Sequence, residues 1–185
     1  MSAGQDPEQR SREPLSHWYP QFQAQTAAEV SQQKRAADDL MIQIVSKRRI
    51  ERMDLYRFQF LISIHGEPGH PLLRTDFRGR RLDLCIAHSG QAGHRAKANH
   101  IERIYRFARK RKRAEHRNLL CQCYYGENRS AAAALVVLLV DSWHPRRAVR
   151  KLYEIQPHAR PAGYILDLIE RFFKLHKGEL HRLLS

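Results

Sequence analysis

The chain has 185 residues, which is enough for one domain, or for one domain with a tail. Hydrophobic residues at 42% and aromatic residues at 9% exclude a wholly disordered chain, and three cysteines without paired spacing exclude a disulfide scaffold. Lys and Arg number 33 against 19 Asp and Glu, so the net charge of +14 favours anionic partners: nucleic acid, an acidic membrane face or phosphorylated molecules.

The first forty residues differ in composition from the rest. Residues 1–40 are rich in Gln, Glu, Arg and Ala and hold three prolines, which predicts a mobile or weakly helical tail before a domain at 41–185. The first eight residues contain no apolar run, so we expect no secretory signal. The longest apolar run, at 131–140, is about half as long as a membrane span. We therefore expect a cytoplasmic protein without a membrane partner.

Strands alternate with helices along the predicted domain. Apolar, β-branched runs predict strands, and segments with helical periodicity predict helices. The predicted strands are 41–45, 58–64, 81–86 and 118–123, and the predicted helices are 48–56, 97–113, 130–142, 145–155 and 162–175, with a last turn at 179–184. This alternation predicts an α/β three-layer sandwich with a central, mostly parallel sheet of about four to five strands. Ligands of such sheets bind at the carboxyl ends of the strands.

The turn after the last predicted strand carries the chemistry. It has the sequence CYYGENRS, residues 123–130, and it precedes a helix that is apolar all round and therefore buried. Its backbone N–H groups can enclose one tetrahedral anion at the positive end of that helix. The expected phosphate-binding residues are Tyr124, Tyr125, Gly126, Glu127, Asn128 and Arg129.

Three side chains of this turn have expected roles in catalysis. Cys123 lies at a helix N-terminus beside a cation, and both features favour a thiolate nucleophile. Arg129 can hold two phosphate oxygens with its planar guanidinium group. The hydroxyl of Ser130 can donate to the sulfur when it leaves in a second step. Tyr124 and Tyr125 either flank the pocket, where they can stack on an aromatic ring or a base, or pack against the protein.

The turn resembles the phosphate-binding loop of the cysteine-dependent protein tyrosine and dual-specificity phosphatases. The resemblance extends over residues 41–184 to a small bacterial family of predicted tyrosine phosphatases, through the stretches 60–64, 82–84, 100–109 and 159–161. It implies a phosphocysteine mechanism without metal or cofactor. Cys123 would attack phosphorus, Arg129 would hold the equatorial oxygens, and water would hydrolyse the phosphoenzyme.

The sequence departs from that family pattern around the nucleophile and at the general acid. The family usually has His before the nucleophile, where this chain has Gln122, and Glu127 adds a carboxylate to the loop. The usual positions of the acidic Asp hold Cys85 or Ile86.

Three possibilities for the general acid therefore stay open. Asp83 can serve, His88 can donate a proton near neutral pH, or no side chain acts as the acid. A tyrosine or serine oxygen needs a proton to leave, whereas the leaving group of a phosphoanhydride does not.

Three functions are consistent with these residues. The leading one is hydrolysis of a phosphate monoester on phosphotyrosine, on a mixed phosphoprotein or on a small molecule. The second is an RNA 5′-triphosphatase or another phosphoanhydride hydrolase, because the pattern at 126–130 is also similar to that of the cysteine-type RNA triphosphatases and because Lys97 to Arg117 holds nine Lys or Arg against two Glu. The third is a pseudophosphatase that binds phosphate groups. The histidines show no metal-ligand spacing, so we assign no metal, and we expect Cys121 in the core.

Overall fold

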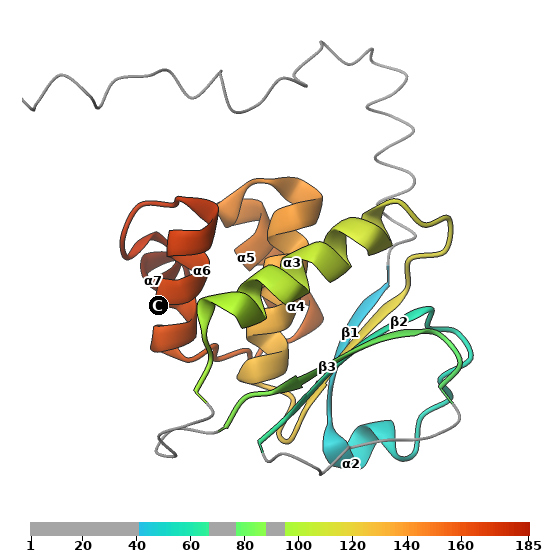
Figure 1. The fold of residues 1–185 in the computed structure, drawn as a ribbon. Coiled ribbons are helices and arrows are strands. Elements are labelled where there is room, and N and C mark those ends of the chain that lie inside the picture. Colours follow the sequence, from blue (N-terminus) through green and yellow to red (C-terminus); the bar gives the residue numbers. More distant parts are fainter. Residues whose placement is uncertain (1–40, 67–76, 88–94) are drawn as a thin grey trace, which may run out of the picture. The chain divides into compact units, whose positions relative to one another are not determined.

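The computed structural model describes residues 41–66, 77–87 and 95–185 (Figure 1). The predicted tail at 1–40 lies outside the described residues, as do residues 67–76 and 88–94, which include His88. The boundary between tail and domain therefore stays a prediction.

Within the described residues, four parallel strands form one sheet with the order β1-β4-β2-β3. The strands are β1 (Ile42–Ser46), β2 (Phe60–His65), β3 (Arg80–Cys85) and β4 (Leu119–Cys123). The helices are α2 (Lys47–Ile50), α3 (Ala98–Lys112), α4 (Arg129–Ser142), α5 (Pro145–Ile155), α6 (Gly163–Phe173) and α7 (Glu179–Leu184). The predicted α/β class with a parallel sheet flanked by helices is confirmed, with four strands.

The helix predicted at 48–56 is wrong in its length. α2 ends at Ile50, and the chain then runs through turns to β2. The side chain of Asp54 accepts a hydrogen bond from the backbone N–H of Tyr56 at 2.9 Å. Asp commonly makes such local turns, and they compete with a continuing helix.

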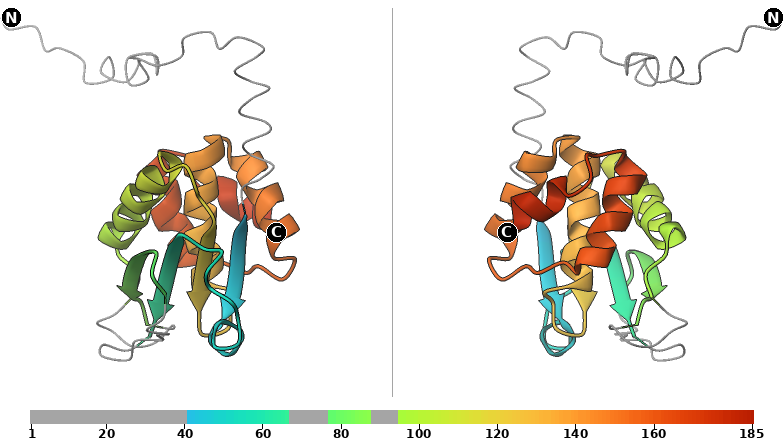
Figure 2. Two further views of the ribbon diagram at one scale, coloured as in Figure 1. Left: turned by 90° about the vertical axis from the view of Figure 1, so that its right-hand side faces the viewer. Right: turned by 90° about the vertical axis from the view of Figure 1, so that its left-hand side faces the viewer.

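The two faces of the sheet are covered differently. On one face α3, α4 and α5 pack against the strands, and α6 and α7 pack on those helices (Figure 2). The other face buries a smaller cluster that includes Val45, Leu61 and Leu120, covered by Ile50 of α2 and by Leu55 and Phe58. Within the described residues, the helical cover of this second face is thus the single turn of α2.

α4 is the central helix of the larger core. Every residue from Arg129 to Val140 is buried, as the apolar run predicts. Four successive alanines at 131–134 leave room for the helix to approach the sheet closely, because small side chains reduce the distance at which two elements pack. The first residue of α4 therefore lies next to the carboxyl end of β4.

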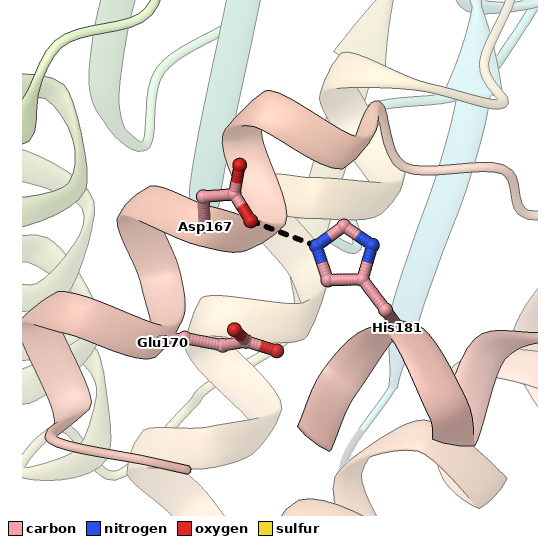
Figure 3. Close-up of side chains that lie close together, drawn as sticks. All are labelled: Asp167, Glu170 and His181. Atoms are coloured by element: carbon pink, nitrogen blue, oxygen red, sulfur yellow. Dashed lines mark hydrogen bonds and ion pairs between the residues drawn. The ribbon is translucent and has the colours of Figure 1, made fainter. Parts of the chain in front are cut away.

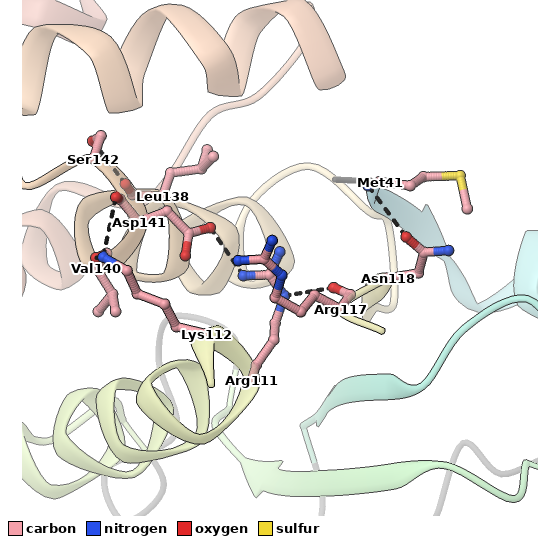
Figure 4. A network of polar contacts seen from close by, with 9 residues as sticks. All are labelled: Met41, Arg111, Lys112, Arg117, Asn118, Leu138, Val140, Asp141 and Ser142. Carbon is pink, nitrogen blue, oxygen red and sulfur yellow. Dashed lines mark hydrogen bonds and ion pairs between the residues drawn. The ribbon is translucent and has the colours of Figure 1, made fainter. Parts of the chain in front are cut away.

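The far end of α4 is held by cations from α3 (Figure 4). Arg111 is fully buried, and its Nη1 donates to the carboxylate of Asp141 at 2.9 Å. The ammonium group of Lys112 donates to the carbonyl oxygen of Val140 at 3.0 Å. These contacts satisfy carbonyls that a helix C-terminus leaves without partners, and they place positive charge where the helix dipole is negative.

Within the described ranges, no helix is both long enough and apolar enough to cross a bilayer.

Candidate active site

The loop 123–130 turns sharply against the end of β1. Gly126 has φ +81°, a conformation that side chains disfavour. A Cβ atom there would lie 2.7 Å from the backbone nitrogen of Ser46 and 2.7 Å from the carbonyl carbon of Val45. Glycine is therefore required both for the backbone conformation and for the close approach to β1.

The thiol of Cys123 lies at the base of this loop. The side chain is 1% exposed. Its Sγ is 3.0 Å from the hydroxyl oxygen of Ser130, and the backbone N–H of Gly126 donates to Sγ at 3.3 Å. A side-chain hydroxyl and a backbone N–H within reach of sulfur are what a thiol nucleophile and leaving group needs. The structure brings Cys123 and Ser130 together as the sequence predicts.

The guanidinium group of Arg129 is fixed at the head of α4. Its Nη1 donates to the carbonyl oxygen of Ile86 at 2.7 Å, so the residue that follows β3 tethers it. A Cβ on Gly66, just after β2, would lie 3.4 Å from the same nitrogen. Arg129 is 6% exposed, which places a positive charge in a confined position between two strand ends. A guanidinium with five donors keeps several of them for a phosphate.

The side chain of Gln122 links β4 to β2 and to the backbone of Cys123. Its Nε2 donates to the carbonyl oxygen of Cys123 at 3.1 Å. Its Oε1 accepts from the hydroxyl of Ser63 on β2 at 2.9 Å, and both side chains are fully buried. Sequence reasoning missed Ser63. The signal was available, because Ser63 is the one polar residue inside the apolar stretch 60–64.

The segment 156–162, which follows α5, holds the loop 123–130 by three hydrogen bonds. Gln156 Nε2 donates to the carbonyl oxygen of Gly126 at 2.9 Å, and the backbone N–H of Arg160 donates to the carbonyl oxygen of Glu127 at 2.8 Å. The side chain of Asn128 accepts from the backbone N–H of Ala162 at 3.2 Å. The Asn128 side chain therefore holds the loop to this segment. Sequence analysis gave Asn128 a place in the phosphate-binding loop and did not predict this contact.

Two tyrosines stand on the outer side of the loop. Tyr124 is 54% and Tyr125 64% exposed, and their rings meet edge to face with centroids 4.8 Å apart. The backbone N–H of Lys47 donates to the carbonyl oxygen of Tyr124 at 3.1 Å. The aromatic pair and the start of α2 are therefore neighbours.

Among the described residues, no contact joins Asp83 to the loop 123–130. It alternates along β3 with Leu82 and Leu84, which pack in the larger core, so its side chain faces the other way. Its carboxylate accepts from Nε and Nη2 of Arg81 at 2.8 and 2.7 Å. His88, the other candidate acid, falls in a segment outside the described ranges. The identity of the acid stays a prediction.

Cys121 and Cys123 have different surroundings although only one residue separates them. Cys121 is fully buried, as expected for a core residue, and burial raises the pKa of its thiol to about 12. At neutral pH this thiol is protonated and unreactive. All three cysteines are free, and Cys85 is partly exposed.

A second cluster of ionisable side chains lies between α6 and α7 (Figure 3). Atoms of Asp167, Glu170 and His181 lie within 4.8 Å of one another. However, Glu170 accepts from the backbone N–H groups of Gly178 and Leu180 at 2.8 and 2.7 Å, and Asp167 pairs with His181 at 2.9 Å. Since both carboxylate oxygens of Glu170 are engaged, the cluster serves to hold the start of α7.

No known protein family matches the sequence, and no curated protein does. The fold is similar to that of solved tyrosine and dual-specificity phosphatases. Tk-PTP in its active form aligns with a TM-score of 0.56 and 15% identity, over 74% of this chain and 93% of Tk-PTP. Human DUSP28 aligns with a TM-score of 0.57 and 16% identity, over 72% and 88%. PTPMT1 in complex with PI(5)P gives 0.55 and 17%, over 78% and 95%. At these identities the likeness is one of fold.

Proposed function

We propose that the chain is a cysteine-dependent phosphatase that hydrolyses a phosphate monoester, with phosphotyrosine or a mixed phosphoprotein as the leading substrate. The observation that carries this proposal is the position of the Cys123 thiol. It lies 3.0 Å from the Ser130 hydroxyl, at the base of a loop that ends in a confined arginine. A nucleophile, a leaving-group donor and a cation for the equatorial oxygens occur together there.

The proposed reaction has two steps that both pass through sulfur. The Cys123 thiolate attacks phosphorus, a P–S bond forms, and the ester P–O bond breaks as the leaving oxygen takes a proton from His88 or, where no side chain acts as the acid, from water. Water then attacks phosphorus and the P–S bond breaks. The Ser130 hydroxyl donates to the departing sulfur, and Arg129 holds the equatorial oxygens in both steps. The product is inorganic phosphate, and the thiolate is restored.

The experiment that tests this proposal compares two cysteines of one strand. Release of phosphate from an aryl phosphate is measured in the presence of a chelator for wild type, Cys123→Ser and Cys121→Ala. We expect Cys123→Ser to lose at least about a thousandfold in rate, because the nucleophile is removed. Cys121→Ala is the matched control, since its thiol is fully buried in the core on the same strand, and it retains activity. Undiminished hydrolysis by Cys123→Ser contradicts the proposal.

The second candidate is an RNA 5′-triphosphatase, and the position of Asp83 favours it. Its carboxylate is engaged by Arg81, and a phosphoanhydride needs no general acid. The basic helix supports this candidate less than its charge suggests, because several of its cations have partners in the protein. These are Arg103 with the Asp83 carbonyl, Arg106 with Glu102, Arg109 with Tyr105, Arg111 with Asp141, and Lys112 with Val140.

The two candidates are separated by offering triphosphate-ended RNA beside the aryl phosphate. Cys123-dependent release from RNA alone, falling steeply with salt, would support the triphosphatase. Activity on neither substrate, with an intact fold, would leave a phosphate-binding module, for which Gln122 and Glu127 are the sequence departures. The cytoplasmic location stays a prediction, which cell fractionation tests.

A further inference from the structure

The first turn after β1 lies beside the catalytic loop. The register of the sheet pairs Ser46, the last residue of β1, with Cys123, the last residue of β4. The next backbone N–H, that of Lys47, donates to the carbonyl oxygen of Tyr124 at 3.1 Å. α2 and the turn from β4 to α4 therefore meet at the same edge of the sheet (Figures 1 and 2).

α2 turns three cations outward at this edge. The Ser46 side chain accepts from the backbone N–H of Arg49 and so fixes the start of the helix. Ile50 is buried under the sheet, which directs the opposite side of the turn to solvent. Arg48 and Arg49 are exposed and Lys47 is partly exposed. We call Lys47, Arg48 and Arg49 the α2 triad, and none of them makes an ion pair with any residue that the structure describes.

The exposed aromatic pair completes this surface. Tyr124 and Tyr125 pack edge to face, with an interplanar angle of 76°. The edge of one ring therefore covers part of the face of the other, so the two rings form an angled surface and not a flat one. Such a surface suits one further aromatic ring in an edge-to-face contact, whereas stacked nucleobases need open parallel faces.

We propose that the α2 triad binds a second anionic group of the substrate, and that the substrate is a phosphotyrosine peptide with an acidic or phosphorylated residue close to the phosphotyrosine. This inference rests on the proposed phosphatase function. The phosphate is held at Cys123 and Arg129, the ring lies against Tyr124 and Tyr125, and the flanking carboxylates or phosphate meet the triad. An extended peptide advances about 3.3 Å per residue and a four-residue turn of helix rises about 6 Å, so the triad matches about two peptide residues.

The test compares the removal of two positive charges from the α2 triad with the removal of two positive charges near the C-terminal end of α4. Arg146 and Arg147 are exposed, adjacent arginines in the first turn of α5. They follow the C-terminus of α4, which is about 21 Å from its N-terminus for fourteen residues. The variants R48Q/R49Q and R146Q/R147Q therefore lose equal charge at different places.

Phosphotyrosine peptides that differ only in acidic or neutral flanks are offered to wild type and both variants. We expect wild type to have a higher kcat/KM for the acidic peptide, and R48Q/R49Q to lose about fivefold or more of that preference, because two ion pairs are removed. R146Q/R147Q keeps the preference. Raising the salt concentration reduces the preference in wild type and has less effect in R48Q/R49Q.

A binding measurement separates failure of this inference from failure of the proposed function. The same peptides, fluorescently labelled, are titrated with Cys123→Ser proteins that carry each arginine pair change. Preferential binding that R48Q/R49Q abolishes supports the inference even if no peptide is hydrolysed. Cys123-dependent hydrolysis of an aryl phosphate without any flank preference, in turnover or binding, overturns the inference and leaves the function standing. An equal loss of the flank preference in R48Q/R49Q and R146Q/R147Q also overturns the inference. So does triphosphate-ended RNA that binds through the triad and displaces the peptides at a lower concentration than the peptides themselves require.

Discussion

α4 begins with Arg129 at the end of the loop 123–130 and has Asp141 in its last turn against Arg111, so each end carries a charge of the sign that the helix dipole disfavours. At the C-terminal end the protein supplies the countercharge, because Arg111 pairs with the carboxylate and Lys112 donates to the last carbonyls. At the N-terminal end Arg129 donates to one neutral carbonyl oxygen. At the C-terminal end a charged partner is thus supplied by the protein itself, whereas at the N-terminal end the recorded partner of the charge is a neutral carbonyl, as the proposed binding of a phosphate to Arg129 requires.

The largest effect is expected from a substitution at the N-terminal end of α4 that keeps the positive charge and changes the shape of the group that carries it. Arg129→Lys retains a cation but loses the planar, bidentate donor. We expect kcat/KM on an aryl phosphate to fall by about two to three orders of magnitude, because one ammonium group cannot hold two equatorial oxygens in the same way. The unfolding midpoint in urea serves as the control and stays near that of wild type. A loss below tenfold would show that charge alone suffices at this end.

The next largest effect is expected at the C-terminal end of α4, from removal of the charge of Asp141. Asp141→Asn leaves the buried Arg111 guanidinium without its anion, and we expect about 3 kcal/mol less free energy of unfolding. Urea denaturation of purified protein measures this. The turnover number of the folded fraction remains close to wild type, because the change lies at the opposite end of α4. The double variant R111M/D141L recovers most of the stability, and failure of that recovery would contradict a purely electrostatic cause.

A smaller effect is expected at Ser130, which follows Arg129 at the N-terminal end of α4. Ser130→Ala removes the hydroxyl 3.0 Å from Sγ, and the departing thiolate then lacks one donor. We expect about a tenfold lower kcat with a smaller change in kcat/KM, because breakdown of the phosphocysteine slows. Rapid-quench kinetics should show a larger burst of the leaving group. An unchanged kcat without a burst would exclude a role for Ser130 in that step.

The smallest effect concerns the start of α3, a third helix end, where cations cluster without an acidic side chain in the first turn. Burial, then the charges of Arg103 and Lys97, lower the pKa of His100 below its usual 6.5. Its Nδ1 accepts from the backbone N–H of Lys97 at 3.0 Å, which requires the unprotonated nitrogen.

The unfolded chain takes up this proton first, so the stability is present above about pH 6.5 and is lost as pH falls through the lower pKa of the folded protein. We expect a loss of a few tenths of a kcal/mol, since the side chain is partly exposed to solvent. Denaturation at pH 7 and pH 5 measures it, and His100→Gln should reduce the difference. An equal pH dependence in the variant would assign the effect to other groups.

The sequence predicted β4, α4 and the loop between them well, because local signals agree there. An apolar strand, a glycine with positive φ and an apolar helix follow one another within residues 119–142. The helix at 48–56 was predicted too long because the turn at Asp54 competes with it locally. The contact of Ser63 with Gln122 and that of Gln156 with the loop were missed because each joins residues that are far apart in the sequence.

The strand order has a consequence for how the chain reaches this structure. Among the strands that the structure describes, every pair is parallel and β1 pairs with β4 alone, with Ile42 opposite Leu119, 77 residues later. Such non-local pairing is slow, because a long loop must close before any contact offsets its entropy. During synthesis the apolar β1 is exposed until β4 has left the ribosome, and an unpaired apolar strand invites aggregation. Slow synthesis at low temperature should therefore raise the soluble yield, and the catalytic loop, which needs both strands, forms late.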